Sequence, residues 1–358
     1  MASADNKRVA KNAIALTLRM VLVTIVGLFT SRIVLQALGV DDYGIYGVIG
    51  GVVGMASFLN TAMAGATSRF ITFELGRGND DKLQKIFSSA LIIHIALALL
   101  VAILAETVGL WFVNHKMNFP PDRMFAVNVL YQFTILSMFV NFTQVPYSAA
   151  IIAHEKMNIY AYFEIINVVL KLLIVYLLLV VSSDRLILYA ALTLGVSVLS
   201  ALIYRFYCIR HFKEAKFKFV RDKAIMKEML SFSGFDLFGN MCAIFRNQSQ
   251  PIILNLFFGV VANAGSSIAY TITGAIGGLT GSIASAFQPQ IVKQYSISKI
   301  DDMISVMRRS VQFTLLAYSL IGLPVYIEVD KILYLWLGQV PPQTGALNNS
   351  PLRFSGRK

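Results

Sequence analysis

Nine apolar runs, each long enough to cross a bilayer, constrain this chain more than any other feature of its sequence. They cover roughly residues 13–38, 44–66, 87–111, 124–150, 159–181, 186–207, 229–257, 262–287 and 304–326. A helix of about 20 apolar residues spans a hydrocarbon core of about 30 Å. Stretches such as LKLLIVYLLLVV (170–181) do not alternate, which excludes the strands of a membrane barrel. The sequence therefore predicts an all-α, polytopic membrane protein with about nine transmembrane helices.

The distribution of charge predicts which ends of these helices face the cytoplasm. Only 14% of the residues are charged, and the net charge is +12. Twenty lysines and arginines fall on one side of the predicted membrane and four on the other. Because cytoplasmic loops collect lysine and arginine, the N-terminus and the basic stretch 208–228 are predicted to be cytoplasmic. We interpret that stretch as a contact with membrane lipids and not with nucleic acid.

A weak internal repeat predicts how the helices are grouped. An offset of about 220 residues aligns Gly39 with Gly259, and it pairs the glycine-rich stretches 47–54 and 274–281. The predicted domains are a six-helix lobe at 1–207, a basic cytoplasmic linker at 208–228, a partial second lobe of three helices at 229–338, and a polar, disordered tail at 339–358. Two parallel lobes with a substrate site between them are typical of transporters.

Polar side chains inside the apolar runs are the candidate substrate-binding residues, because a charge at the bilayer centre costs about 2.5 to 3.5 kcal/mol. The set is Arg246, Asp236, Asn240, Asn247, Gln250, Arg19, Arg32, Glu164 and Lys171. Within the 229–257 run, Asp236, Asn240, Asn247 and Gln250 recur at helical spacing and predict a polar stripe along one helical face. Arg246 belongs to the same run but not to this face. Asn141, Gln144 and Asn167 add polar groups to other runs. Two alternatives stay open: Glu164 and Lys171 forming an interhelical ion pair, and Arg19 and Arg32 reaching the membrane interface.

The sequence has no motif typical of an enzyme. LGRGNDDK lacks the pattern of a phosphate-binding loop, and the four histidines are scattered. AHEKM lacks the second histidine of a zinc helix motif. We therefore expect no catalytic residue, no metal site and no cofactor.

Several segments resemble a known family. LGVDDYGIYGVIGGVV, TSRFITFELGRGNDDKLQKIFSSAL and NLFFGVVANAG are similar to segments of bacterial polysaccharide (O-antigen type) flippases. These belong to the superfamily that also contains multidrug and toxic-compound extruders and lipid II flippases. The resemblance implies a transporter in the bacterial cytoplasmic membrane that moves a polyprenyl-pyrophosphate-linked oligosaccharide by alternating access, for polysaccharides such as lipopolysaccharide. It also implies polysaccharide polymerase and glycosyltransferase partners. Coupling to protons or sodium would involve Asp236 or Glu164.

The chain departs from that family at its C-terminal end. Family members normally have twelve or more helices, whereas the last 18 residues here lose all apolar periodicity. The sequence thus favours a C-terminally truncated or frame-shifted product, and one alternative function is a non-transporting fragment. Another is a multidrug cation antiporter, although intramembrane cations outnumber carboxylates. A membrane-embedded glycan polymerase or ligase would need a larger outer loop than residues 112–123 provide.

Overall fold

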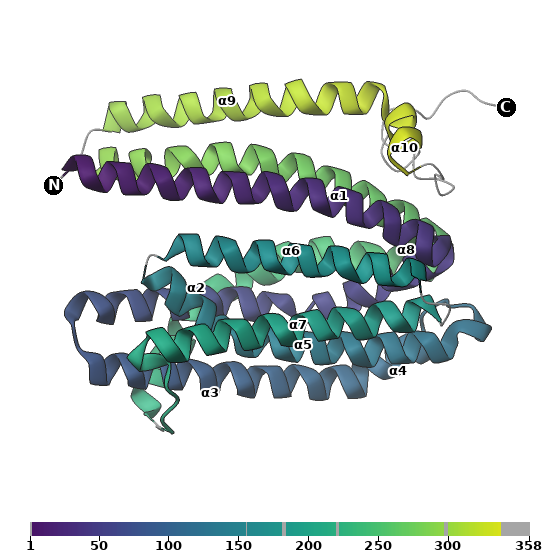
Figure 1. Ribbon diagram of the computed structural model, residues 1–358, viewed down its shortest axis with the longest axis horizontal. Coiled ribbons are helices and arrows are strands. Elements are labelled where there is room, and N and C mark those ends of the chain that lie inside the picture. Colours follow the sequence, from purple (N-terminus) through teal and green to yellow (C-terminus); the bar gives the residue numbers. More distant parts are fainter. Residues whose placement is uncertain (1, 155, 181–183, 220–221, 297–299, 338–358) are drawn as a thin grey trace. The chain divides into compact units, whose positions relative to one another are not determined.

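The computed structural model describes residues 2–154, 156–180, 184–219, 222–296 and 300–337. Within these ranges the secondary structure is entirely helical (Figure 1). Seven helices among the described residues are long and apolar enough to cross a membrane. The protein is therefore a multi-pass membrane protein, as predicted. The sidedness of its N-terminus stays a prediction.

Two long helices are each interrupted by one glycine. Helix α1 (Ala2–Gly54) contains Gly39 at φ 82° and ψ 174°, and α8 (Lys223–Ser296) contains Gly259 at φ 77° and ψ −171°. Positive φ favours glycine because a Cβ would be strained there. The two breaks divide two of the seven spans, Leu22–Gly54 and Leu237–Gly278, each into two helical segments. The glycines that the repeat pairs therefore share one backbone conformation.

One predicted segment was wrong in detail. The apolar run at 44–66 is not one helix, because α1 ends at Gly54 and α2 (Ser57–Arg77) follows a turn at Met55 and Ala56. The Ser57 hydroxyl donates to the Gly54 carbonyl at 2.6 Å across that turn. No proline or polar cluster marks the position in the sequence.

The chain divides into two compact units, residues 37–263 and residues 1–36 with 264–358. Each unit boundary lies within four residues of one of the interrupting glycines. This division rests on contacts between residues, whereas the predicted lobes 1–207 and 229–338 rest on the repeat. The predicted lobes stay a prediction.

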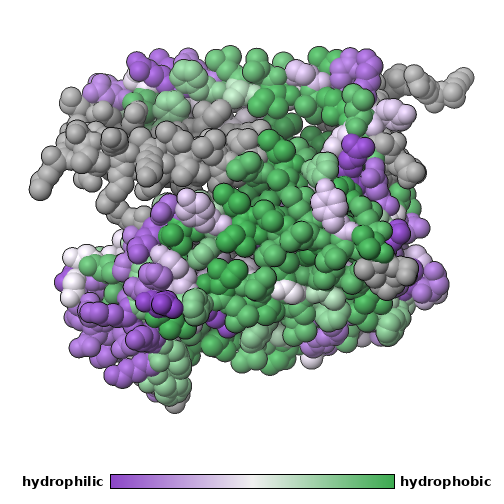
Figure 2. All heavy atoms as spheres, in the orientation of Figure 1, coloured by the Kyte–Doolittle hydropathy of each residue, from purple (hydrophilic) through white to green (hydrophobic). Residues whose placement is uncertain are grey.

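Helix α5 (Met124–Ala153) is the centre of the 37–263 unit. It contacts α2, α3 (Asp80–Leu104), α6 (Met157–Val180) and α7 (Arg185–His211). Figure 1 shows α3, α5 and α7 lying side by side. Phe87, Tyr131 and Tyr204 are among the fully buried side chains of the 37–263 unit. In Figure 2 hydrophobic residues cover the middle of this bundle and hydrophilic residues gather at its end near the α2–α3 turn.

Short elements close one end of α5. A π-helical turn (Ala105–Gly109) leads into α4 (Leu110–His115), and a 3₁₀ turn (Pro121–Arg123) precedes α5. The Tyr131 hydroxyl donates to the Ala105 carbonyl at 2.7 Å. A Cβ at Gly109 would lie 2.2 Å from that hydroxyl, so any larger residue would displace the buried Tyr131 side chain.

Arg123 ties three elements together at the same end. Its Nε donates to Asp42 of α1 at 2.9 Å, and its Nη1 donates to Asp184 at 2.7 Å. Asp184 also caps α7, because its carboxylate accepts from the Leu186 and Ile187 amides. The acidic pair in LGVDDYG thus supplies a partner for a distant arginine.

The opposite end is held by a second set of contacts. A 3₁₀ turn (Lys213–Ala215) follows α7, and its Glu214 pairs with His154 at 2.5 Å. Burial is the largest single influence on the pKa of Glu214 and raises it, but the hydrogen bond from His154, a backbone hydrogen bond and the charge of His154 together leave that pKa below its usual value. His154 also stacks on Phe212 with ring centroids 4.1 Å apart.

The other unit contains residues 1–36, the end of α8, α9 (Ile300–Ile327) and α10 (Val329–Leu337). The Trp336 indole donates to the Leu28 carbonyl at 2.9 Å, and the Gln36 amide donates to the Leu337 carbonyl at 3.0 Å. Ser310 is the only buried residue of α9, all of which the structure describes. The predicted polar tail at 339–358 lies outside the described residues.

Candidate functional site

A polar cavity of about 350 Å³ lies within the 37–263 unit, between α5, α6 and α7. Ten of its twelve lining residues are polar, among helices that are otherwise apolar. Polar groups inside a membrane bundle are costly unless they face a cavity or one another. This cavity is therefore the candidate functional site of the unit.

Helix α6 contributes the charged groups of the cavity. Glu164, Asn167 and Lys171 line it at i, i+3 and i+7, which places them on one helical face. The Glu164 carboxylate accepts a hydrogen bond from the Tyr204 hydroxyl at 3.4 Å. Tyr204 is 1% exposed and packs edge to face against Phe163, so it fixes the position of that carboxylate.

Lys171 has an exposed side chain and forms no hydrogen bond or ion pair with a described residue. Glu164 likewise forms no ion pair within the described part of the chain. The alternative in which these two charges belong to a structural ion pair thus receives no support from the described residues. A lysine facing a cavity can bind an anion.

Helix α5 lines the cavity with Ser137, Asn141, Gln144 and Ser148. Pro146 lies in the same stretch and cannot donate a backbone hydrogen bond to the preceding turn of the helix. The Ser148 hydroxyl donates to the Val145 carbonyl at 2.9 Å. Its oxygen therefore remains an acceptor, which suits a cation or a sugar hydroxyl.

Helix α7 supplies hydroxyl groups in the same manner. Thr193 donates to the Tyr189 carbonyl at 2.7 Å, and Ser197 donates to the Thr193 carbonyl at 3.1 Å. Both residues line the cavity, as does Ser200. The cavity thus combines many oxygen acceptors with one carboxylate and one ammonium group.

Arg205 lies in α7 about one turn beyond the cavity-lining Ser200. It donates to the Thr143 hydroxyl at 2.5 Å, and its guanidinium lies 5.8 Å from the Tyr147 ring centroid. Its buried Nε has no partner among the described residues. Arg205 is one of the twenty charges assigned to the cytoplasmic side, although the predicted span 186–207 contains it and apolar residues, LSALIY and FYCI, lie on both sides of it.

The predicted polar stripe of α8 lies outside this cavity. The Arg246 side chain is exposed, and its Nε donates to the side-chain amide oxygen of Asn247 at 3.4 Å. Asn247 and Gln250 are also exposed, and Asn240 is half-buried. The side chain of Asp236 lies outside the described residues.

The remaining predicted residues belong to α1. Arg32 is half-buried, and the side chain of Arg19 lies outside the described residues. Both lie in the unit of residues 1–36 and 264–358. Of the nine predicted site residues, the structure brings Glu164 and Lys171 together.

Comparison with known proteins assigns the chain to a family. Residues 9–295 match the polysaccharide biosynthesis protein family. This chain belongs to that family. A similar protein is the uncharacterized membrane protein EpsK of Bacillus subtilis (strain 168), which is 18% identical over 307 residues. The match covers 85% of this chain and 60% of EpsK, so the chain spans about three fifths of that relative's length.

Solved structures similar to this polysaccharide biosynthesis family member are transporters of the MOP superfamily. An inward-facing multidrug resistance MATE family transporter matches with a TM-score of 0.66 at 13% identity, over 94% of this chain and 78% of that one. A MOP superfamily transporter from Pyrococcus furiosus matches with a TM-score of 0.62 at 14% identity, over 93% and 75%. VcmN of Vibrio cholerae in its bent form gives 0.59 at 14% identity, over 94% and 79%.

The TM-scores of these matches show a shared fold, and they confirm the predicted all-helical membrane architecture. The resemblance to flippases is confirmed at the level of the polysaccharide biosynthesis family and the MOP fold. The prediction that the chain is not an enzyme agrees with the family match and with the transporters that share the fold.

Proposed function

We propose that this member of the polysaccharide biosynthesis family is a flippase of the bacterial cytoplasmic membrane. It moves a polyprenyl-pyrophosphate-linked oligosaccharide to the outer leaflet by alternating access, and the products serve surface polysaccharides of the O-antigen type. The observation that carries the proposal is the polar cavity lined by Glu164 and Lys171 within apolar helices. Glycosyltransferases that build the cargo and a polymerase that consumes it are the proposed partners.

The chemistry of the cavity suits part of such a cargo. An ammonium group binds phosphate, and amide and hydroxyl groups bind sugar hydroxyls. A volume of about 350 Å³ is near the lower end of ligand pockets. The cavity therefore accommodates a pyrophosphate or one or two sugars, and the rest of the cargo lies outside it.

Glu164 is proposed as the coupling group, which binds a proton or a sodium ion. Its carboxylate has one hydrogen-bond donor, Tyr204, and lies among hydroxyl and amide oxygens. Carboxylate and neutral oxygen ligands are those that hard cations prefer. Binding of a cation at Glu164 would also neutralise the carboxylate while an anionic cargo occupies the cavity beside Lys171.

The second candidate is a multidrug cation antiporter, which the MATE-like fold favours. An organic cation would bind Glu164 but would be repelled by Lys171 in the same cavity. Surface glycan and drug resistance, measured in the same cells, separate the two functions.

The test is complementation of a flippase-deficient bacterial strain, read as surface glycan at equal protein level. Loss of one charge-assisted hydrogen bond costs about 1.5 to 3 kcal/mol, which is roughly ten- to a hundredfold in affinity. Lys171→Gln and Glu164→Gln are expected to lower surface glycan strongly. Lys85→Gln and Glu228→Gln change exposed charges outside the cavity and should leave it unchanged. Normal glycan with both cavity variants would contradict the assignment.

A further inference from the structure

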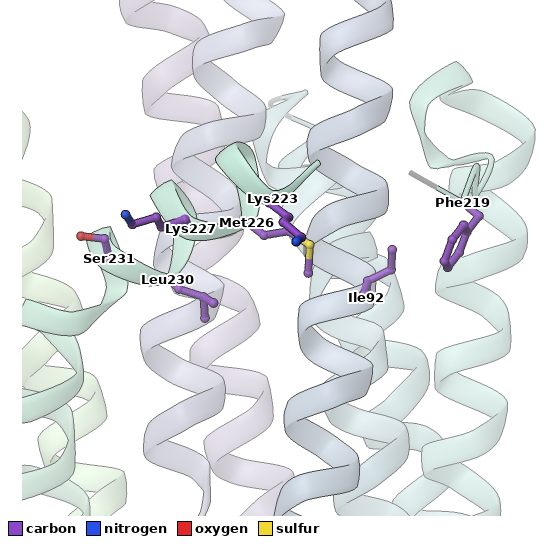
Figure 3. Close-up of a pocket in the computed structure, with 7 residues that line it drawn as sticks. All are labelled: Ile92, Phe219, Lys223, Met226, Lys227, Leu230 and Ser231. Atoms are coloured by element: carbon purple, nitrogen blue, oxygen red, sulfur yellow. The ribbon is translucent and has the colours of Figure 1, made fainter. Parts of the chain in front are cut away.

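A second cavity, of about 650 Å³, lies at the beginning of α8 within the 37–263 unit. Figure 3 shows Ile92 of α3 between Phe219 on one side and Met226 and Leu230 of α8 on the other. Lys223 and Lys227 lie on the same part of α8. The cavity thus has an apolar floor and two ammonium groups.

Helical spacing explains this combination. Lys223, Met226, Lys227 and Leu230 recur at i, i+3, i+4 and i+7, which is one face of the first two turns of α8. Lys223 and Lys227 form no ion pair with a described residue. The face therefore presents uncompensated positive charge directly beside apolar side chains.

The walls of the cavity are firmly held. Ile225 and Met229 lie on the other side of α8, are 8% and 0% exposed, and pack into the hydrophobic core. The Asp222 carboxylate caps α8 by accepting from the Ala224 amide at 3.0 Å. On the opposite wall, the Lys218 amide donates to the Ser88 hydroxyl at 3.2 Å, next to Phe219.

The depth of the cavity matches the membrane interface. The Gln84 amide donates to the Lys216 carbonyl, so residues 216–218 lie level with residues 84–88 of α3. The predicted membrane-spanning part of α3 begins at residue 87. Ile92 is five residues further along, or roughly 7 Å at 1.5 Å per residue. Interfacial helices insert their apolar face to about this depth, ~5 to 10 Å.

The exposed side chains indicate what covers the cavity. Phe219 is 77% exposed and Leu230 is 47% exposed, although both are large and apolar. They are covered when acyl chains occupy the cavity, while Lys223 and Lys227 face the headgroups. The cytoplasmic leaflet carries anionic lipids, which attract lysines close to a membrane surface.

We propose that this cavity binds an anionic phospholipid of the cytoplasmic leaflet. The headgroup phosphate lies between Lys223 and Lys227, and an acyl chain covers Ile92, Met226 and Leu230. The site is separate from the polar cavity of α5, α6 and α7, and the proposal does not depend on which cargo the protein moves. The bound lipid connects the basic segment after α7 to the start of α8.

The test measures binding of phosphatidylglycerol to the purified 358-residue chain in neutral detergent by native mass spectrometry. Each lysine near an anionic lipid contributes enough to change affinity about fivefold. Lys223→Gln with Lys227→Gln is expected to weaken binding roughly thirtyfold. Lys213→Gln with Lys216→Gln removes the same charge from neighbouring residues that do not line the cavity, and it should change binding less than threefold.

Three further ligands define the chemistry. Phosphatidylcholine with the same acyl chains should bind weakly, and glycerol phosphate without acyl chains should not compete. Equal loss of phosphatidylglycerol in both double variants would overturn the proposal, because a general charge effect would then explain binding. Competition by glycerol phosphate would overturn it in favour of a free phosphate site. Displacement by a hundredfold lower concentration of polyprenyl pyrophosphate would overturn it in favour of a cargo site.

Discussion

The stretch of α1 after Gly39 and the stretch of α8 after Gly259 differ in packing although the repeat pairs them. In α1, a Cβ at Gly44 would lie 2.1 Å from the Val260 carbonyl oxygen, and one at Gly51 would lie 3.1 Å from Pro251. In α8, a Cβ at Gly274 or Gly277 would meet no atom within 4 Å.

The comparison shows that the repeat determines backbone conformation but not contacts. Both breaks need the same positive φ, so glycine is required at each. Glycines further along each helix are required only where another backbone approaches closely, as lipid-embedded helices do at small residues. The α1 stretch after Gly39 has such a close neighbour in residues 248–260 of α8. Both stretches belong to the 37–263 unit.

The largest expected effect is that of Gly44→Ala. The added methyl group cannot fit against the Val260 carbonyl, so the two helices must separate. Overpacking of this kind costs about 1 to 3 kcal/mol, and a backbone neighbour places it at the upper end. Thermal unfolding in detergent should show a clear loss of stability. An unchanged midpoint would mean that the close approach of the two stretches is absent in solution.

Arg123→Ala should have the next largest effect. It removes the ion pairs of Arg123 with Asp184 and with Asp42, which lies three residues after the break at Gly39. Asp42 and Asp184 would lose a shared partner, and their side chains are 15% and 32% exposed. We expect a loss of about 2 kcal/mol, between the values for exposed and buried pairs. Lys331→Ala breaks an exposed pair with Glu328 in the other unit and should cost under about 0.5 kcal/mol. Equal effects of the two variants would contradict the difference between the units.

The pH dependence of Asp184 sharpens this test. The hydrogen bond from Arg123 is the largest cause that lowers the pKa of Asp184 below its ordinary value of 3.8, although burial opposes it. A carboxyl with a lowered pKa stabilises the fold above its unfolded value, and that contribution is lost as pH falls through the folded pKa.

Asp184→Asn keeps a capping side chain and removes only the charge. It should therefore cost about 1 kcal/mol between pH 5 and 7, and the difference from wild type should shrink below pH 3.8. Unfolding midpoints at each pH provide the measurement. A difference that grows as the pH falls would have the wrong sign for this ion pair.

The smallest expected effect is a gain in stability from Gly274→Ala. The new methyl group enters open space, and alanine in a helix is favoured over glycine by about 0.5 to 1 kcal/mol. The unfolding midpoint should rise slightly, in contrast to Gly44→Ala. A marked fall would reveal a neighbour that packs against this face in solution.

Local signals in the sequence predicted much of the fold. Apolar length gave the spans, and the repeat identified Gly39 and Gly259 as equivalent positions, which their matching dihedral angles confirm. Helix limits such as Gly78 and Asn79 follow from side-chain chemistry, because glycine ends α2 and asparagine caps α3. The turn at Met55 and Ala56 carries no such signal, and it was missed.

The candidate site was only partly predictable. The spacing of Glu164 and Lys171 on one face was visible in the sequence, but their convergence with Asn141 and Ser197 depends on how α5, α6 and α7 pack. The same spacing on α8 predicted a stripe whose Asn247 and Gln250 are exposed and outside that cavity. Periodicity identifies a face of a helix, whereas tertiary packing decides what that face meets.

The most direct measurement is translocation of a fluorescent polyprenyl-pyrophosphate-linked oligosaccharide by the purified 358-residue chain in liposomes. Access of a membrane-impermeant glycosidase to cargo that starts in the inner leaflet reports the transfer. We expect transfer above that of protein-free liposomes and a rate at least about tenfold lower with Lys171→Gln. No transfer by the wild-type chain, or equal rates for wild type and Lys171→Gln, would contradict the proposed function of the cavity.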